Sequence, residues 1–331
     1  MDPLSQATIG AVAAQSSITR QDLARLGLIG ALAGMAPDLD VIIQSSTDPL
    51  LQLEYHRQFT HSLVFIPIGA IVCAVAFWPF VRRHMSFKAV WFTALVGYAT
   101  HGLLDACTTY GTLLLWPFSD ARIAWNTISV VDPLFTLPLL GFAITAAVRK
   151  SQLIGRLGMA WVAFYLSIGV FQEERALAAG EALAAQRGHA PAIVSAKPSF
   201  GNLLLWKTVY EYGDQFWVDA VRAGGSVTII EGEHVERLDL TAAFPWLDAK
   251  SQQARDVERF RWFSNDYLAI DRDDPSLIVD MRYSHLPNEI QGLWGIRLNP
   301  DASVDEHVTW IARRSAGSER FEQLWAMLKG K

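Results

Sequence analysis

The sequence predicts an α-helical polytopic membrane domain over residues 1–171, followed by a soluble α+β domain over residues 172–331. Hydrophobic residues make up 51% of the 331-residue chain, and they are concentrated in its first half. Four long apolar stretches there approach the ~20 residues that a membrane-spanning helix needs. Most of the charged residues follow residue 171, which is typical of a soluble domain, and the length is enough for two domains.

The first half is expected to cross the membrane four times. The predicted spans are residues 62–81, 89–107, 130–148 and 157–171. Arg82, Arg83 and Lys88 follow the first span, and Arg149 and Lys150 follow the third. Short loops rich in Lys and Arg stay in the cytoplasm. Residues 44–61, residues 108–129 and the C-terminal domain are therefore expected on the outer side.

The N-terminal 43 residues contain two shorter apolar runs, 8–14 and 23–36. They fit either a helical hairpin that enters the membrane and returns, or two amphipathic helices lying on the bilayer. No basic leader precedes the first run, so no cleavable signal peptide is expected. Cys73 and Cys107 lie within apolar segments and are expected as small core residues. A net charge of −5 argues against a nucleic-acid partner.

The second half alternates helical and strand patterns. Gly213-Asp214 separates two strand-like runs, residues 202–212 and 215–222, and predicts a β-hairpin. Further strands are expected at 226–230, 277–283, 293–298 and 307–313, and helices at 172–187, 251–263 and 318–328. This pattern is typical of an α+β domain with antiparallel pairing.

Candidate metal ligands gather at the outer ends of the predicted spans. They are Asp38, Asp40, His56, His61, His101, Asp105 and Asp132. An ionisable group deep in a membrane costs roughly 2.5–3.5 kcal/mol, so such a set is rarely accidental. Imidazole and carboxylate ligands without thiolates suit Zn²⁺, with Mn²⁺ or Fe²⁺ as alternatives. Seven candidates exceed the ligands of one catalytic zinc, so one or two ions are expected.

The spacing of the histidines predicts how they reach a common site. His101 and Asp105 are four residues apart, which places them on one helix face, although a polar pair joining two helices has the same spacing. His56 and His61 are five apart, a rotation of about 140° on a helix. We therefore expect His56 in a loop and His61 on the first turn of the span, with Thr60 near the N-cap.

The acidic residues and the neighbouring arginine each allow a second interpretation. Asp38 and Asp40 need an irregular turn to point the same way, and are otherwise interfacial acids or a helix cap. Asp132 precedes Pro133 at the start of the third span, where an aspartate commonly serves as an N-cap. Arg57 either extends its charge toward the membrane surface or clamps an anionic substrate oxygen.

Several motifs together resemble a known bacterial family. PDLD, HRQFTHS, HGLLDACTTYG and the later Asp-Pro occur in the order typical of the membrane-bound, metal-dependent hydrolases, the inner-membrane putative hydrolases of the YdjM-like, partly LexA-regulated type. The resemblance covers about residues 1–150. It implies a multi-pass protein of the bacterial inner membrane, with a periplasmic C-terminal domain and a metal site built from the seven residues above. Gln6 stands where members commonly carry a histidine.

The expected function is therefore hydrolysis of an ester or phosphoester at the outer membrane face. A distant similarity of the family to zinc-dependent phospholipase C favours a lipid or phosphodiester substrate. A bound metal would activate water, Asp40 or Asp105 would take its proton, and Arg57 would neutralise developing charge.

The alternative is a non-enzymatic membrane module, in which a structural His/Asp cluster joins helices and the C-terminal domain binds a partner. An ion transporter would need polar residues through the full membrane depth, and the cytoplasmic halves of the spans carry almost none.

Overall fold

The computed structural model describes residues 1–17, 22–313 and 317–330, which form two compact units. The first unit is helical and comprises Met1–Ile42, Tyr55–Phe171 and Phe200–Leu203. The second contains the β-sheets and comprises Ile43–Glu54, Gln172–Ser199 and Leu204–Lys331. The expected order of a helical region followed by a sheet-containing region is confirmed.

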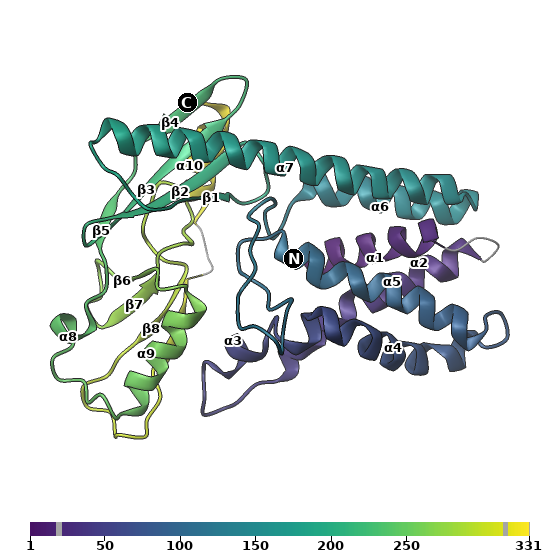
Figure 1. Cartoon of the computed structure of the whole chain (residues 1–331), viewed down its shortest axis with the longest axis horizontal. Helices are drawn as coiled ribbons and strands as arrows, with labels where there is room; N and C mark the ends of the chain where they lie inside the picture. The colour runs from purple at the N-terminus through teal and green to yellow at the C-terminus, as the bar shows by residue number, and fades with distance from the viewer. Residues whose placement is uncertain (18–21, 314–316, 331) are drawn as a thin grey trace. The chain divides into compact units, whose positions relative to one another are not determined.

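Helix α5 lies at the centre of the helical unit (Figure 1). The helices are α1 (Pro3–Ser17), α2 (Leu23–Met35), α4 (Ile66–Val81), α5 (Phe87–Ala106), α6 (Pro133–Arg149) and the start of α7 (Gln152–Gln186). Three short 3₁₀ segments, η1 (Ala36–Ile42), η2 (Phe59–His61) and η3 (Leu63–Phe65), join them. Because α5 contacts α1, α2 and α4, its C-terminal end can meet residues from several segments.

Glycines bring α1, α2 and α5 into backbone contact. A Cβ atom built on Gly97 of α5 would lie 2.4 Å from the carbonyl oxygen of Gly30 in α2. A Cβ on Gly30 would in turn lie 2.3 Å from the carbonyl oxygen of Gly10 in α1. Small residues at such crossings allow close approach, as is common between membrane helices. The two apolar N-terminal runs thus form a packed pair of helices whose contact faces are buried.

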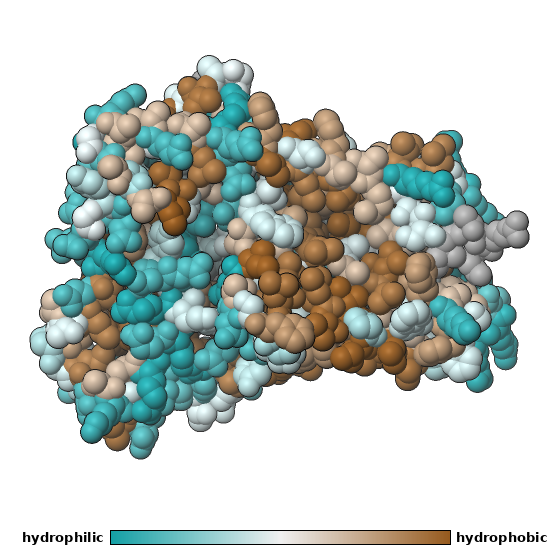
Figure 2. All heavy atoms as spheres, in the orientation of Figure 1, coloured by the Kyte–Doolittle hydropathy of each residue, from teal (hydrophilic) through white to brown (hydrophobic). Residues whose placement is uncertain are grey.

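Large apolar side chains cover the outside of the helical unit, as the hydropathy-coloured surface shows (Figure 2). They include Val72 on α4, Leu137 on α6 and Phe164 on α7, each about 60% exposed. By length and composition, one described helix, Gln152–Gln186, could cross a membrane. Leu51–His61 and Ile66–Val81, bent by 87°, would add a second if they act as one span. Four separate spans therefore remain a prediction.

The second unit contains two antiparallel sheets. The first has the order β1-β2-β3-β4, and β5 pairs with β3. Its strands are β1 (Val194–Pro198), β2 (Leu205–Tyr212), β3 (Gln215–Ala223), β4 (Val227–Ile230) and β5 (His234–Glu236). The second sheet has the order β6-β7-β8-β9. Its strands are β6 (Leu268–Ile270), β7 (Leu277–Asp280), β8 (Trp294–Arg297) and β9 (Thr309–Ala312).

Helices cover these sheets through small apolar cores. Helix α9 (Gln252–Phe263) packs Val257 and Phe260 against residues of β6, β7 and β8. Helix α10 (Ser318–Lys329) packs Leu324 and Met327 against β2 and β3. Leu50, ahead of the short helix α3 (Leu51–Tyr55), joins the α9 core, which explains why residues 43–54 belong to the second unit. Helix α8 (Leu240–Ala243) is a single turn.

The predicted hairpin is confirmed, since Tyr212 pairs with Gln215 across Gly213, whose φ is +61°. The helix expected at 172–187 is instead the continuation of α7, because no glycine or proline interrupts residues 170–176. The short strands β1, β5 and β6 were not predicted. β1 begins three residues after Pro191 and ends on Pro198, and β5 and β6 have only three residues each, so their alternation is too short to recognise.

We expect Gly97→Ala to destabilise the helical unit by about 1–3 kcal/mol, because the added methyl group overlaps the Gly30 carbonyl. The measurement is thermal unfolding of the detergent-solubilised chain. Gly141→Ala in α6 is the matched control, since its added Cβ meets nothing within 4 Å. Equal melting temperatures for Gly97→Ala and the unmodified chain would refute the close packing of α2 on α5.

Candidate metal centre

Three separate segments bring six of the seven predicted ligands to the same end of the helical unit. The segment η1 carries Asp38 and Asp40, and the loop before α4 carries His56 and His61. His101 and Asp105 lie on one face near the end of α5, as the four-residue spacing predicts. The tight turn of η1 is the irregular element expected for the two neighbouring aspartates.

His61 and His101 face each other through the same ring atom. Their Nε2 atoms are 2.9 Å apart, and both side chains are fully buried. Nδ1 of His101 donates to the carbonyl oxygen of Gly34 at 2.6 Å. Nδ1 of His61 lies 2.9 Å from the Thr60 hydroxyl, which itself donates to Asp40. If both rings were neutral with Nδ1 protonated, two Nε2 lone pairs would face each other, so this contact needs either a proton on one Nε2 or a shared cation.

Two carboxylates complete the first group of candidate ligands. Asp38 Oδ1 lies 3.3 Å from Nε2 of His101 and 3.5 Å from Nε2 of His61. Asp105 Oδ2 lies 3.4 Å and 3.7 Å from the same two atoms. The ligand atoms offered by these four residues all fall within 4.8 Å of one another. Two imidazoles and two carboxylates form a donor set that suits zinc and similar divalent ions.

Asp38 also belongs to a second group. Asp38, Asp40 and His56 again place their ligand atoms within 4.8 Å of one another. The Asp38 side chain is 25% exposed, whereas those of Asp40 and Asp105 are fully buried. One carboxylate shared by two groups of ligands is the arrangement that a two-ion site requires.

Asp40 is surrounded by hydrogen-bond donors. Its carboxylate accepts from Nδ1 of His56 at 2.8 Å, from the Thr60 hydroxyl at 2.8 Å and from the backbone N–H of Arg57 at 3.2 Å. Nδ1 of His61 lies 3.3 Å from the same group. Asp40 therefore orients both histidines of this loop. Thr60 takes part as a donor to Asp40 and does not cap a helix. The prediction of His61 on the first turn of the span is also wrong, because His61 lies on η2, Ser62 caps η3, and α4 begins only after Phe65.

The carboxylates of the His/Asp cluster stabilise positive charge on neighbouring groups. Burial would raise the pKa of Asp38 and of Asp40, but hydrogen bonds with the histidines hold both pKa values well below the ordinary range. Burial would likewise lower the pKa of His61, yet its bonds with Asp105, Asp38 and Asp40 raise that pKa to about 10. Positive charge is therefore stabilised where the ligand atoms converge.

Arg57 is locked beside the cluster. Its backbone has a φ of +65°, a region that residues with side chains rarely adopt, and its carbonyl accepts from the N–H of Leu113. The guanidinium Nε lies 3.1 Å from Asp105 Oδ2, and Nη1 donates to Thr108 at 3.0 Å. The side chain is buried and lies over the Tyr110 ring at 5.2 Å. Such strain is typical of functional positions.

Gln6 lies inside the site. It is fully buried in α1, and its Nε2 donates to Asp105 Oδ1 at 3.0 Å. Gln6 Oε1 is a buried oxygen atom without a hydrogen-bond donor, whereas Asp105 Oδ2 is ion-paired with Arg57. Orphaned acceptors of this kind are costly unless a cation or water meets them. Thr108 and Tyr110, which hold Arg57, were not predicted as site residues, although their TxY motif follows Asp105 directly.

Asp132 does not join either group of ligands. Its Oδ1 caps α6 by accepting from the N–H groups of Leu134 and Phe135 at 3.1 and 3.2 Å. Both carboxylate oxygens also accept from the Tyr165 hydroxyl at 2.8 Å. The residue is buried, with its oxygen atoms already engaged, so the structure places it as an N-cap and helix link.

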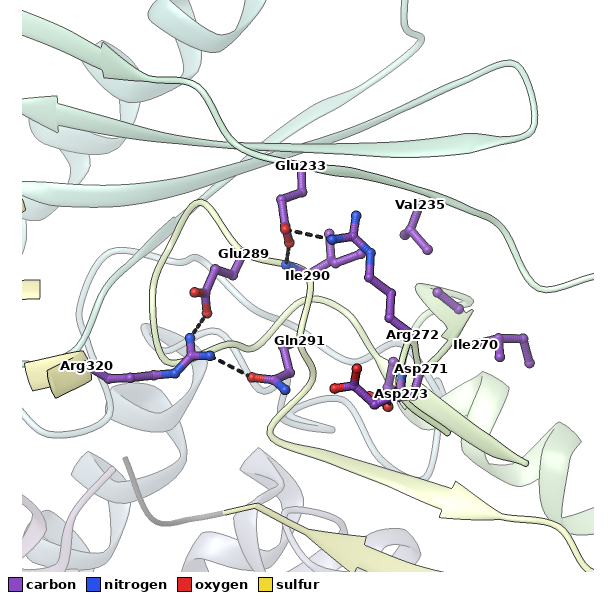
Figure 3. A pocket seen from close by; sticks show the side chains of 12 residues that line it. Glu233, Val235, Ile270, Asp271, Arg272, Asp273, Glu289, Ile290, Gln291 and Arg320 are labelled. Atoms are coloured by element: carbon purple, nitrogen blue, oxygen red, sulfur yellow. Dashed lines mark hydrogen bonds and ion pairs between the residues drawn. The ribbon is translucent and has the colours of Figure 1, made fainter. Parts of the chain in front are cut away.

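The second unit contains a separate cavity of about 230 Å³ (Figure 3). Its apolar floor includes Val235, Ile270 and Ile290. Its walls contain the ion pairs Glu233–Arg272 and Glu289–Arg320. The cavity shares no residue with the His/Asp cluster.

Comparisons with known proteins cover the helical half. Residues 1–176 match the model of a family described as YdjM inner membrane protein. The chain is 27% identical over 140 residues to the uncharacterized protein YfhP of Bacillus subtilis, covering 41% of this chain and 42% of that protein. It is 35% identical over 114 residues to the inner membrane protein YbcI of Escherichia coli, covering 32% and 62%. The chain thus spans less than two thirds of either relative. No solved structure matches it.

Asp132 and His101 are expected to respond differently to substitution. Asp132→Ala should destabilise the chain by about 1–2 kcal/mol through loss of the cap and leave bound metal unchanged. His101→Ala should lower metal content in protein that is still folded. Elemental analysis beside thermal unfolding measures both effects. Metal loss in Asp132→Ala at full folding would restore Asp132 as a ligand.

Proposed function

Because this chain belongs to the YdjM inner membrane protein family, we propose that its helical unit is a membrane-bound, metal-dependent hydrolase. The observation that carries the proposal is the pair of buried Nε2 atoms of His61 and His101, 2.9 Å apart and flanked by Asp38 and Asp105. Two neutral imidazoles would repel at this separation, and either a proton or a metal ion at the Nε2 atoms removes that repulsion.

The donor set fits a divalent ion. Asp38, His61, His101 and Asp105 would hold the first ion, and Asp38, Asp40 and His56 a second. The buried Gln6 Oε1, which has no hydrogen-bond donor, is further support for a cation at the first position. Zinc suits this mixture best, with manganese or iron as alternatives. An ion bound there would lower the pKa of water toward neutrality and so favour hydrolysis.

The surrounding residues take distinct parts in this proposal. Asp40 holds the tautomers of His56 and His61, and its low pKa makes it a poor proton acceptor, so we assign it to orientation instead of proton transfer. Asp105 Oδ2 is ion-paired with Arg57 and its Oδ1 with the N-terminal amine, so we assign Asp105 to metal ligation and to holding Arg57. Arg57 holds Asp105 and would neutralise negative charge on the reacting group.

The substrate class follows from charge and surroundings. Two ions close together are the usual means of phosphoester hydrolysis, and a buried arginine beside them suits an anionic phosphate or carboxyl ester. The exposed apolar surface of the helical unit suits a lipid bilayer, so a lipid-derived ester or phosphodiester could reach the site along the membrane. We propose such a lipid substrate at the outer face of the inner membrane.

The second candidate is a structural metal that joins η1, α5 and the loop before α4. The burial of His61 and His101 favours it, because structural sites are closed to water. The 25% exposure of Asp38 favours catalysis, because it leaves one side of the site open.

Arg57→Ala should reduce hydrolysis of a phosphodiester or lipid ester by about a hundredfold while metal content changes little. Arg57→Lys should recover only part of the rate, because lysine lacks the planar fork that contacts Asp105 and Thr108 together. Steady-state rates and elemental analysis of both variants provide the measurement. Unchanged turnover in Arg57→Ala would remove Arg57 from the mechanism.

The basic loops at 82–88 and 149–156 predict that the C-terminal unit is periplasmic. An alkaline phosphatase reporter joined after Lys331 should be active, and a green fluorescent protein reporter at the same place should be dark. Fusions after Arg83 should show the reverse. A cytoplasmic signal from the C-terminal fusion would overturn this topology, and with it the outer-face location of the site.

A further inference from the structure

Three buried cationic side chains lie close together in the second unit. Lys197 of β1 and Lys207 of β2 are direct cross-strand partners, and Arg282 follows β7. They are 8%, 4% and 3% exposed. Asp280, the carboxylate beside them, is already held by Arg282 through contacts of 2.9 and 2.7 Å. A buried charge without a counterion is strongly unfavourable, so this arrangement favours a neutral lysine.

Lys207 is bonded to a serine hydroxyl. Its Nζ lies 2.8 Å from Oγ of Ser284 and 2.8 Å from the carbonyl oxygen of Glu289. In this arrangement Lys207 donates to both oxygens, and the Ser284 hydroxyl donates to the carbonyl oxygen of Leu286 at 2.6 Å. A neutral Lys207 could accept the serine proton once the hydroxyl turns away from Leu286. Ser284 lies on the loop between β7 and β8 and is only half-buried, whereas the lysine behind it is buried. Ser284 is thus the more exposed residue of the pair.

The groups that face Lys207 explain its charge state. Burial is the main influence and lowers the pKa of Lys207 to about 7, with Asp280, Glu289 and Glu233 opposing and Lys197 adding to the effect. Burial and Arg282 lower the pKa of Lys197 to about 8. A substantial fraction of Lys207 is therefore unprotonated near neutral pH.

We propose that Ser284 is a nucleophile and Lys207 its general base, forming a second hydrolytic site for acyl esters that is independent of the metal centre. Ser284 Oγ attacks the ester carbonyl carbon as its proton passes to Lys207 Nζ. The bond to the alcohol oxygen then breaks, and the alcohol leaves with that proton. Water, deprotonated by Lys207, attacks the acyl-serine, and release of the acid restores the hydroxyl and the neutral amine.

The same loop provides room for an acyl group. Residues 289–291, which follow Ser284 on this loop, form one wall of the 230 Å³ cavity (Figure 3). The Glu289 carbonyl accepts from Lys207, and the Glu289 side chain lines the cavity. Ser284 itself does not line the cavity, whose lining combines apolar residues such as Ile290 and Ile270 with charged residues such as Glu289 and Arg320. A small ester with a polar end suits this mixed lining.

The test is labelling of the full chain in detergent with a fluorophosphonate, which replaces its P–F bond with a bond to an activated serine oxygen and releases fluoride. We expect a mass-spectrometric adduct on Ser284 that forms equally well in EDTA. Lys207→Met and Lys207→Arg should slow labelling by about a hundredfold, since neither side chain can accept a proton near neutral pH. Ser276→Ala is the matched control and should label at the normal rate.

The pH profile separates a base from a merely structural lysine. Labelling should rise with pH through a midpoint near 7, because only unprotonated Lys207 accepts the proton. Lys197→Met removes a neighbouring cation and should move this midpoint to higher pH. Thermal unfolding checks that each variant is folded. An unlabelled Ser284 in the folded chain, or labelling that persists at the normal rate in folded Lys207→Arg, would overturn the proposal.

Discussion

The helical unit is organised around two imidazole rings whose Nε2 atoms face each other in a buried space lined by carboxylates. This geometry exists because each ring has its other nitrogen committed, His101 to the Gly34 carbonyl and His61 to Thr60 and Asp40. The Gly34 carbonyl reaches His101 because α2 packs against α1 and α5 through glycines, and a Cβ at Gly34 would lie 2.7 Å from the Gln6 backbone oxygen. Helix packing and ligand orientation are thus one constraint.

The residues around the rings are held more firmly than a simple polar contact between helices would need. Asp40 accepts several hydrogen bonds from the loop that it orients, and Arg57 keeps a left-handed backbone between Asp40 and Leu113. Buried polar networks are stable only when their members are satisfied, yet Gln6 Oε1, beside Asp105, lacks a donor. This unsatisfied oxygen lies beside the candidate ligands, where a bound cation would be placed. The packing of the unit is thereby connected to its proposed chemistry.

The two units concentrate charge in opposite ways. The metal centre gathers buried carboxylates and stabilises positive charge at His61. The interior of the second unit gathers the buried cations Lys197, Lys207 and Arg282 around a carboxylate that is already paired. Burial strengthens electrostatic interactions in both places, so one site favours a bound cation and the other favours loss of a proton. Each unit can therefore carry its own chemistry.

The sequence alone determined those features that depend on a single short segment. Helical periodicity placed His101 and Asp105 on one face, and the Gly213-Asp214 turn set the register of the β2–β3 hairpin. Tertiary structure alone decided between a ligand and a cap for Asp132, because both uses suit an aspartate before a helix and only the Tyr165 contact distinguishes them.

The tertiary structure also decided that Asp40 orients histidines and that residues 43–54 join the second unit. Both outcomes depend on partners far along the chain. The paired lysines show the same limit. Lys197 and Lys207 are ten residues apart and unremarkable in sequence, and only strand pairing and burial bring their charges together.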